Sequence, residues 1–317
     1  MKARLALVAA ILAALFCMAQ SPMSAFPPGI FDNKGAQAPA PPVYIGPGDS
    51  SVTPNAAFWG SCARAYSAAY AASRGNMCLL YGVTTTTTCQ EVANPSGFAD
   101  WNSALSCVGG TVTVNTFCTV TNTSCTVETL DDQTGTMASP PTQGTVSHRP
   151  TLVLNDLNGL PTMDCSAASV DLTSVSTITA AQPITFNAVY IRTSGTSTNQ
   201  MLESTSANIL LETAATSNNV TMSAGTAVTA AATDSVWHSV SAEFNNASSD
   251  YNIDGTDTTG VNMNNHTLST GINVCNSVKG RQAEAGIWYT PNDLGTSTLR
   301  GNLFSNQNSV NGYGGLL

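Results

Sequence analysis

Apolar and polar residues alternate with a period of two along the last third of the chain. In the segment 236–244, the apolar residues that recur at every second position are Val240, Ala242 and Phe244. Such alternation is typical of a β-strand with one buried face. Asp254-Gly255 then predicts a tight hairpin turn, because glycine adopts a positive φ without steric cost. A further strand is expected over 283–289, where alanine, isoleucine and tyrosine recur at every second position.

Short segments of this kind recur along the rest of the chain about every ten residues, which is the spacing of a sandwich or barrel. Further strands are expected at 77–81, 86–92, 111–118, 125–130, 184–191, 209–212, 220–222, 251–253 and 272–275. Two helices are expected, an alanine-rich one over 57–73 and another over 293–308. Asn158-Gly159 predicts a second hairpin turn. The pattern has no regular alternation of strands with helices, so it indicates an all-β fold.

The charge of the chain restricts its partners. Only 9% of the 317 residues are charged, with 10 basic against 19 acidic residues. Soluble domains usually have about 25% charged residues, so most of the polar surface must consist of Thr, Ser, Asn and Gln. An acidic surface that is poor in lysine argues against nucleic acid or an anionic membrane as a partner. It suits a neutral partner, such as an extracellular polysaccharide.

The N-terminus has the pattern of a cleaved signal peptide over residues 1–19. Basic residues precede an apolar stretch over 5–16, and the expected cleavage lies before Gln20. The apolar stretch is shorter than the roughly 20 residues that a membrane-spanning helix needs. We therefore expect a secreted protein, extracellular or periplasmic, with no membrane insertion after cleavage. Residues 20–55, rich in proline and glycine, are expected to be a linker before one domain over 56–317.

Eight cysteines follow the expected cleavage point, and an even number in an exported protein predicts disulfides. They are Cys62, Cys78, Cys89, Cys107, Cys118, Cys125, Cys165 and Cys275. Cys118 and Cys125 close a short loop, and Cys78 and Cys89 flank a predicted hairpin, so we expect these two pairs. The cysteines that remain give Cys62–Cys107 and Cys165–Cys275. We expect no metal site built from cysteine, because no Cys-x2-Cys spacing occurs and only three histidines are present.

Several motifs in the second half resemble laminin-G-like and concanavalin A-like sandwiches. They are the Trp237-His238 strand, the Asp254-Gly255 hairpin and the strand that begins at Gly280-Arg281. This resemblance implies an all-β, concanavalin A-like antiparallel β-sandwich, or jelly roll, here with one short N-terminal helix. Such sandwiches mostly bind or cleave glycans, so the question is whether this chain binds a glycan, cleaves one or has only a structural role.

Residues 57–317 also resemble the catalytic domain of the α-L-arabinofuranosidase B family. The matching positions are 64–67, Phe117-Cys118 with Cys125, and the turn Asp132-Gln133 with Gly135. The turn departs from the family pattern at Asp131 and at Thr136-Met137. The resemblance implies a sandwich that carries a glycoside hydrolase site, or the remains of one.

A retaining glycosidase needs a nucleophile and an acid/base carboxyl about 5–5.5 Å apart. The resemblance implies Glu212 as the nucleophile. At the acid/base position stands Cys275 or Asn276, and neither can donate a proton as a carboxylic acid does. Glu284 or Asp254 are the substitutes if the match is displaced by several residues. We therefore expect a secreted glycan-binding or surface-adhesion protein that does not cleave its ligand.

Four side chains are further candidates for ligand binding, namely Asp132, Gln133, Trp237 and His238. The Asp131-Asp132 pair is also where a calcium ion would bind, as in many lectin-like sandwiches, and no other cofactor is expected. Two alternative functions stay open. One is a retaining α-L-arabinofuranosidase that uses Glu212, and the other is a structural appendage protein of a cell surface or virion.

Overall fold

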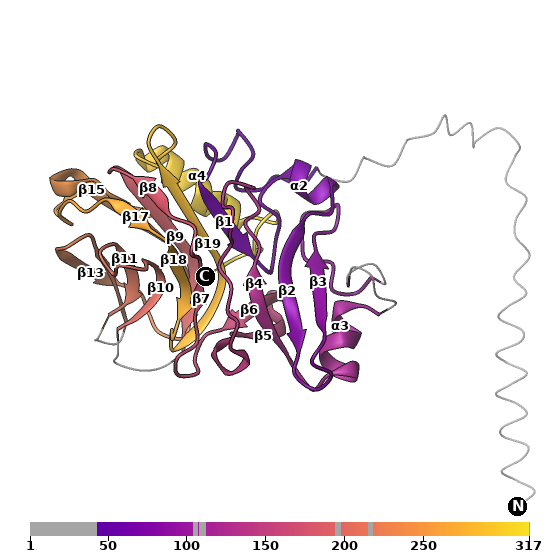
Figure 1. Ribbon diagram of the computed structural model, residues 1–317. Helices are drawn as coiled ribbons and strands as arrows, with labels where there is room; N and C mark the ends of the chain where they lie inside the picture. The colour runs from indigo at the N-terminus through magenta and orange to yellow at the C-terminus, as the bar shows by residue number, and fades with distance from the viewer. Residues whose placement is uncertain (1–42, 104–106, 108–111, 194–197, 215–217, 317) are drawn as a thin grey trace, which may run out of the picture. The chain divides into compact units, whose positions relative to one another are not determined.

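The computed structural model describes residues 43–103, 107, 112–193, 198–214 and 218–316. The expected signal peptide over 1–19 lies outside these residues. The described part is the expected all-β, concanavalin A-like antiparallel β-sandwich (Figure 1). None of its helices has the length and apolar character that crossing a membrane requires.

Two antiparallel sheets form the sandwich. The larger sheet has eleven strands, in the order β16 (Thr256–Val261), β15 (Ser249–Ile253), β14 (Trp237–Phe244), β9 (Ile184–Arg192), β19 (Gly280–Tyr289), β6 (Leu160–Asp164), β5 (Thr151–Leu157), β4 (Cys125–Leu130), β2 (Asn76–Gly82) and β3 (Thr88–Val92), with β1 (Phe58–Ser61) paired to β19. The smaller sheet has six, in the order β13 (Ala227–Ala231), β12 (Asn219–Ser223), β11 (Leu210–Thr213), β10 (Asn199–Ser204), β18 (Ile272–Asn276) and β7 (Leu172–Thr173). A separate pair consists of β17 (Leu268–Thr270) and β8 (Ile178–Ala180).

Helical segments are few and short. They are α2 (Ala68–Ala72), α3 (Val114–Thr116), α4 (Ser297–Asn308), the π-helical turn η1 (Phe117–Thr121) and the 3-10 turns η2 (Val146–His148) and η3 (Asn246–Ser248). Helix α2 begins after Ser67, whose hydroxyl accepts a hydrogen bond from the backbone N–H of Tyr70. Helix α4 confirms the helix expected over 293–308.

The main core lies between the inner faces of the two sheets. Phe186 of β9 and Phe244 of β14 meet edge to face there, with ring centroids 5.5 Å apart. From the smaller sheet, Leu202, Leu211 and Met222 stand in register across three strands and are fully buried. Burial of each such side chain stabilises the fold by about 1.5–3 kcal/mol. Because side chains alternate along a strand, the neighbouring residues of the smaller sheet face away from this core.

Both predicted hairpin turns are confirmed. Asp254 and Gly255, with φ values of 52° and 84°, join β15 to β16, and Asn158 and Gly159, with φ values of 50° and 87°, join β5 to β6. Positive φ at both central residues is what a tight two-residue hairpin requires. Gly255 meets a second constraint, since a Cβ atom there would lie 2.8 Å from the ring of Phe304 in α4.

Two expected elements are wrong. The helix expected over 57–73 is confined to α2, because residues 58–61 form β1 and pair with β19. Phe58 and Trp59 are fully buried in this arrangement, and burial of two large aromatic side chains outweighs a weak local preference for helix. The strand expected over 111–118 is also wrong. There α3 and η1 are helical, and the hydroxyl of Thr113 caps the first turn.

The eight described cysteines all form disulfides, and two of the four expected pairs are confirmed. These are Cys118–Cys125 and Cys165–Cys275. The expected pairs Cys78–Cys89 and Cys62–Cys107 are wrong, since the structure joins Cys62 to Cys78 and Cys89 to Cys107. The register of the β2–β3 hairpin explains the difference, because it places Cys89 opposite Leu80 and not opposite Cys78.

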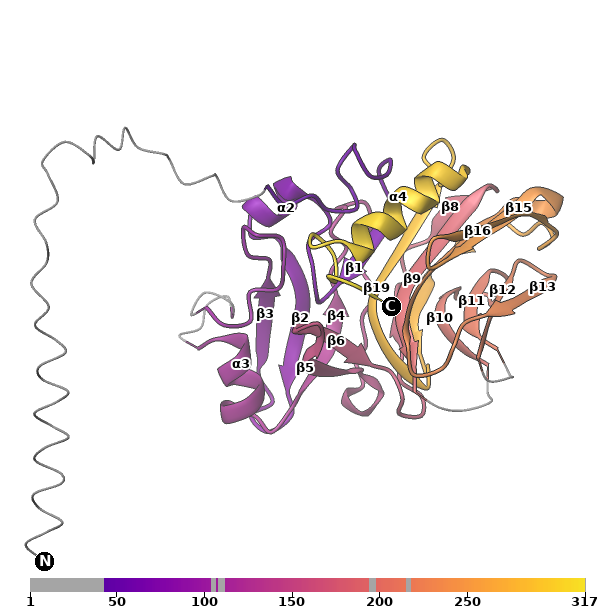
Figure 2. The same cartoon turned by 180° about the vertical axis from the view of Figure 1, so that it is seen from behind.

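Helix α4 lies against the outer face of the larger sheet (Figure 2). Its Arg300 is fully buried and holds the helix in place through three ion pairs. The partners are Glu243 of β14 at 2.8 Å, Asp250 of β15 at 3.0 Å and Asp257 of β16 at 2.8 Å. The two sheets therefore differ, since α4 contacts β14, β15 and β16 of the larger sheet, and within the described residues no helix packs in this way on the outer face of the smaller one.

Candidate functional site

Two rows of mostly polar side chains cross the outer face of the smaller sheet. Residues directly opposite each other on paired strands point to the same face, so the strand register defines each row. The first row runs through Thr229, Thr221, Glu212, Gln200 and Asn276. The second runs through Ser223, Leu210, Glu203, Asn273 and Thr173. The same alternation that sends Leu202, Leu211 and Met222 into the core therefore sends these polar side chains outward.

Glu212 lies in the middle of the first row, on β11, and is only 8% exposed. Gln200, directly opposite on β10, donates a hydrogen bond from Nε2 to Oε2 of Glu212 at 3.1 Å. Burial raises the pKa of Glu212, the hydrogen bond from Gln200 opposes this shift, and the charge of Glu203 adds to it. Glu212 therefore holds a proton more readily than an ordinary glutamate.

Glu203 is the second carboxylate of this face and is 5% exposed. Its Oε1 accepts hydrogen bonds from two amides, Asn276 at 2.7 Å and Asn273 at 2.8 Å. Asn273 is held in turn by the hydroxyl of Thr173 at 2.8 Å. Both amide groups thus have fixed orientations, with their N–H groups turned toward Glu203.

Hydrogen-bond acceptors on this face remain available to a ligand. Within the described residues, Oε1 of Glu212, Oε2 of Glu203, Oε1 of Gln200 and Oδ1 of Asn276 have no hydrogen-bond partner. None of these atoms belongs to the buried polar atoms without a partner, so each keeps some contact with solvent. Four acceptors on adjacent strands form a surface that binds groups rich in hydroxyl or N–H donors.

The structure places the residue expected at the acid/base position on this same face. Asn276 lies directly opposite Gln200, which lies directly opposite Glu212, so one strand separates Asn276 from Glu212. Cys275 forms a disulfide with Cys165 and is fully buried. Asn276 is therefore the group that shares the face with Glu212, and an amide cannot act as a general acid.

The two substitutes considered for the acid lie elsewhere. Glu284 is fully buried on β19, where it pairs with Arg64 at 2.8 Å and accepts the hydroxyl of Tyr313 at 2.7 Å. Asp254 lies in the β15–β16 turn and pairs with His238. Both belong to the larger sheet and its turns, so neither faces Glu212.

Glu203 was not identified from the sequence, yet it is the carboxylate that influences Glu212. The reason is a bulge between Gln200 and Leu202 in the pairing of β10 with β11. Met201 and Leu202 are consecutive and both fully buried, so strict alternation fails in this strand. The signal in the sequence is the pair of consecutive apolar residues between two polar ones, which is typical of a bulged strand.

Trp237 and His238, expected to bind a ligand, are held mainly by the protein itself. Trp237 packs on a cluster that includes Val189 and Tyr313, and the guanidinium of Arg281 lies 5.9 Å from its ring centroid. His238 contacts Asp254 through Nδ1 at 2.5 Å and the carbonyl of Thr233 through Nε2 at 2.8 Å. Ligand binding by these two residues stays a prediction. It is separate from the two rows of side chains on the outer face of the smaller sheet, which we call the polar face.

Asp132 and Gln133, also expected to bind a ligand, organise a turn. Asp132 accepts hydrogen bonds from the backbone N–H groups of Trp59, Thr136 and Met137 at 3.2, 2.8 and 2.8 Å. Gln133 is buried and bonds to the backbone of Ser61, Arg64 and Tyr66. The role that the contacts assign to both residues is to join this turn to β1.

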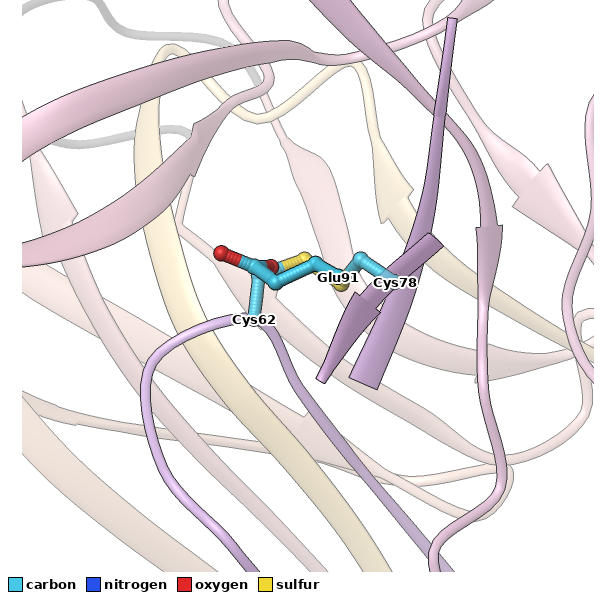
Figure 3. A group of neighbouring side chains, drawn as sticks. All are labelled: Cys62, Cys78 and Glu91. Carbon is cyan, nitrogen blue, oxygen red and sulfur yellow. A yellow bond between two sulfur atoms is a disulfide. The ribbon is translucent and has the colours of Figure 1, made fainter. Parts of the chain in front are cut away.

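Three buried side chains, Cys62, Cys78 and Glu91, lie together near β2 and β3 (Figure 3). Their potential ligand atoms are within 4.8 Å of one another. Both sulfurs are joined in a disulfide, so neither is the thiolate that a metal ion needs. Burial raises the pKa of Glu91 well above its usual value, and the charges of Asp100 and Asp131 act in the same direction. A neutral carboxylic acid beside a disulfide is a poor metal ligand, and we assign no metal site here.

Known structures provide a coarse comparison. A sialidase of Trypanosoma rangeli in complex with sialic acid matches with a TM-score of 0.39 and 9% identity, over 75% of this chain and 46% of that one. Domain 4 of AbnA, a GH43 extracellular arabinanase from Geobacillus stearothermophilus, in complex with arabinotriose, gives 0.35 and 9%, over 54% and 91%. A SAP-like pentraxin from Limulus polyphemus gives 0.32 and 12%, over 43% and 74%.

These likenesses carry no argument about the function of this chain, because their TM-scores are below 0.5. The matched part also spans less than half of the sialidase chains. No protein-family model and no curated protein matches the chain. The function is therefore argued from the polar face itself.

Proposed function

We propose that this chain is an exported glycan-binding protein that holds sugar on the outer face of its smaller sheet without cleaving it. The observation that carries the proposal is the group of free acceptor atoms on Glu212, Gln200, Glu203 and Asn276. Sugar hydroxyls are hydrogen-bond donors, and a flat row of fixed acceptors on a sheet suits them. The four disulfides support export, since they persist in oxidising compartments.

The absence of cleavage follows from the chemistry of the two groups that face each other. Hydrolysis with retention needs one carboxylate nucleophile and one carboxylic acid on either side of the scissile bond. Across Gln200 from Glu212 stands Asn276, which has no acidic proton to give. The interaction that remains is binding by hydrogen bonds.

A second candidate function, hydrolysis by a retaining α-L-arabinofuranosidase mechanism, is favoured by one observation. After burial, the charge of Glu203 is the other influence that raises the pKa of Glu212. Two carboxyls close enough to influence each other, one of them disposed to keep its proton, is the arrangement from which an acid and a nucleophile are built. In this mechanism Glu212 would be the acid and Glu203 the nucleophile, which differs from the role of nucleophile that the family resemblance implies for Glu212.

Two assays separate these functions. Retardation in gels that contain arabinan or xylan measures binding, and release of a chromophore from an aryl arabinofuranoside measures hydrolysis. We expect retardation without turnover, with retardation weaker in Glu212→Gln and Asn276→Ala than in the wild type. Gln90→Ala on β3 of the other sheet is the matched control and should bind as the wild type does. If the chain turns the substrate over, and either Glu203→Gln or Glu212→Gln abolishes this turnover, hydrolysis and not binding alone is its function. Neither activity, together with assembly into a larger particle, would favour a structural appendage.

A further inference from the structure

A continuous groove runs along one end of the sandwich and shares no residue with the polar face. It consists of three adjoining hollows of about 460, 190 and 550 Å3. The first two share Ala57, Thr136 and Tyr289, and the last two share Asn55, Pro291 and Asn292. Strand β8, the end of β19 and the start of α4, which border the groove, lie at this same end in both views of the fold (Figures 1 and 2).

The walls of the groove are fixed by hydrogen bonds. The wall at Thr136 and Met137 belongs to the turn whose N–H groups are held by the carboxylate of Asp132. The wall at Pro54 and Asn55 is tied to β19, because the indole N–H of Trp288 donates to the carbonyl of Pro54 at 2.9 Å. A groove held in this way does not have to be ordered when a ligand enters, which lowers the entropic cost of binding.

The lining of the groove combines polar and apolar groups and is almost free of charge. Hydroxyl and amide side chains line its length, and Asp293 is the one charged residue among the lining residues. Tyr289 borders both of the first two hollows and is half-buried, with part of its ring packed on the core. Within the described residues, the side chains of Tyr289, Asn55 and Asn292 make no hydrogen bond, so their polar atoms are free for a ligand.

We infer that this groove binds a single chain of a neutral, hydroxyl-rich polysaccharide, in addition to any sugar bound on the polar face. Free amides and hydroxyls pair with sugar hydroxyls, and the half-buried ring of Tyr289 offers an apolar surface to the face of a sugar ring. Three hollows in sequence suit a ligand that repeats along its length. The described lining has no basic residue, which argues against polyanions such as nucleic acids and acidic polysaccharides.

The inference is tested by electrophoresis through gels that contain a neutral polysaccharide, with arabinan, arabinoxylan, mixed-linkage β-glucan and galactomannan as the probes. The assay uses the Glu212→Gln chain, in which the polar face is disabled, so that only the groove is measured. At least one of the four polymers should retard this chain. Polygalacturonate should not, and raising the salt concentration should leave the retardation unchanged.

Substitutions in the groove then separate it from the rest of the surface. Tyr289→Ala in the same background should weaken binding roughly 2- to 12-fold, the range for one aromatic contact, and Tyr289→Phe should keep most of it. Asn55→Ala should also weaken binding. Asn265→Ala, which alters an exposed asparagine outside the groove, is the matched control. Thermal unfolding confirms that each variant is folded.

Three outcomes would overturn the inference. One is that none of the four neutral polymers retards the Glu212→Gln chain. Another is that Tyr289→Ala and Asn265→Ala bind alike, and a third is that the acidic polymer binds best. The polar face fails independently of the groove, because its failure appears as equal retardation of the wild type and Glu212→Gln.

Discussion

Replacing Glu91 with glutamine is expected to remove a pH dependence from the stability of the fold. Glu91 lies on β3 beside the Cys62–Cys78 disulfide and is fully buried, and neither of its carboxyl oxygens has a hydrogen-bond partner in the described residues. Burial raises its pKa well above the usual 4.5, and the charges of Asp100 and Asp131 add to the shift. The folded chain therefore keeps this proton at pH values where the unfolded chain releases it.

The sign and size of the effect follow from proton linkage. A carboxyl with a raised pKa contributes fully to stability below its unfolded pKa, and this contribution is lost as the pH rises toward the folded pKa. The loss is about 1.4 kcal/mol per pH unit while the folded carboxyl stays protonated. Relative to Glu91→Gln, the wild type should therefore lose about 2.5 kcal/mol of unfolding free energy between pH 5 and pH 7.

Urea unfolding at pH 5, 6 and 7, with all disulfides intact, measures this difference. Glutamine keeps the shape of Glu91 but cannot titrate in this range. Its unpaired amide adds a penalty that is the same at each pH, so the penalty shifts the curve without changing its slope. If the unfolding free energies of the wild type and Glu91→Gln run parallel from pH 5 to pH 7, the carboxyl is not buried in its neutral form and the reasoning fails.

Four more predictions concern stability. Arg300→Met should cost about 3–5 kcal/mol in urea unfolding, because it leaves three carboxylates under α4 without their cation; an effect below about 1 kcal/mol would contradict the ion-pair cluster. Removing Cys165–Cys275, which spans 110 residues, should cost about 4.7 kcal/mol, against about 2.5 kcal/mol for Cys118–Cys125, which spans 7; equal losses would argue against the chain-entropy account. Burial opposes the charged form of His238, but hydrogen bonds to Asp254 and Thr233 prevail and raise its pKa above 6.5. The stabilisation of the fold by protonated His238 is therefore complete below pH 6.5 and declines as the pH rises above it. His238→Gln should flatten this decline of the melting temperature with pH. Asn276→Asp should destabilise the chain at pH 7 by about 1.5–3 kcal/mol, since a carboxylate would replace the amide that donates to Glu203, and stability should recover as the pH falls toward 4; wild-type stability at pH 7 would show that this hydrogen bond is absent in solution.

The long core strands could be predicted from the sequence because their signal is local. In β9, β14 and β19 the apolar residues that face the core recur at every second position, and the Asp254-Gly255 and Asn158-Gly159 turns have the residues that positive φ demands. β1 could not be predicted in this way. Its strand conformation depends on pairing with β19, more than two hundred positions away, where Phe58 lies opposite Ile287.

The disulfides show the same difference between signals that are local in the sequence and contacts that depend on long-range packing. Cys118–Cys125 follows from closeness in sequence, whereas Cys62–Cys78 and Cys89–Cys107 depend on how separate segments pack. A cross-strand disulfide needs its two cysteines directly opposite, and the register of β2 with β3 offers Leu80 to Cys89 in place of Cys78. A register difference of two residues therefore decides the pairing, and the composition of the hairpin does not reveal that difference.

The side chains of the polar face could also be predicted only in part from the sequence. Glu212 could be identified because the family resemblance implies it, whereas Glu203 follows a bulge and was missed. The two asparagines that bind Glu203 are three positions apart, a spacing that would put them on opposite faces of a regular strand. Cys275, which lies between them, has φ of 61°, an uncommon value for a residue other than glycine, and its disulfide to Cys165 anchors it. The kink returns Asn276 to the face of Asn273, so a core disulfide helps to place this amide on the same face as Glu212.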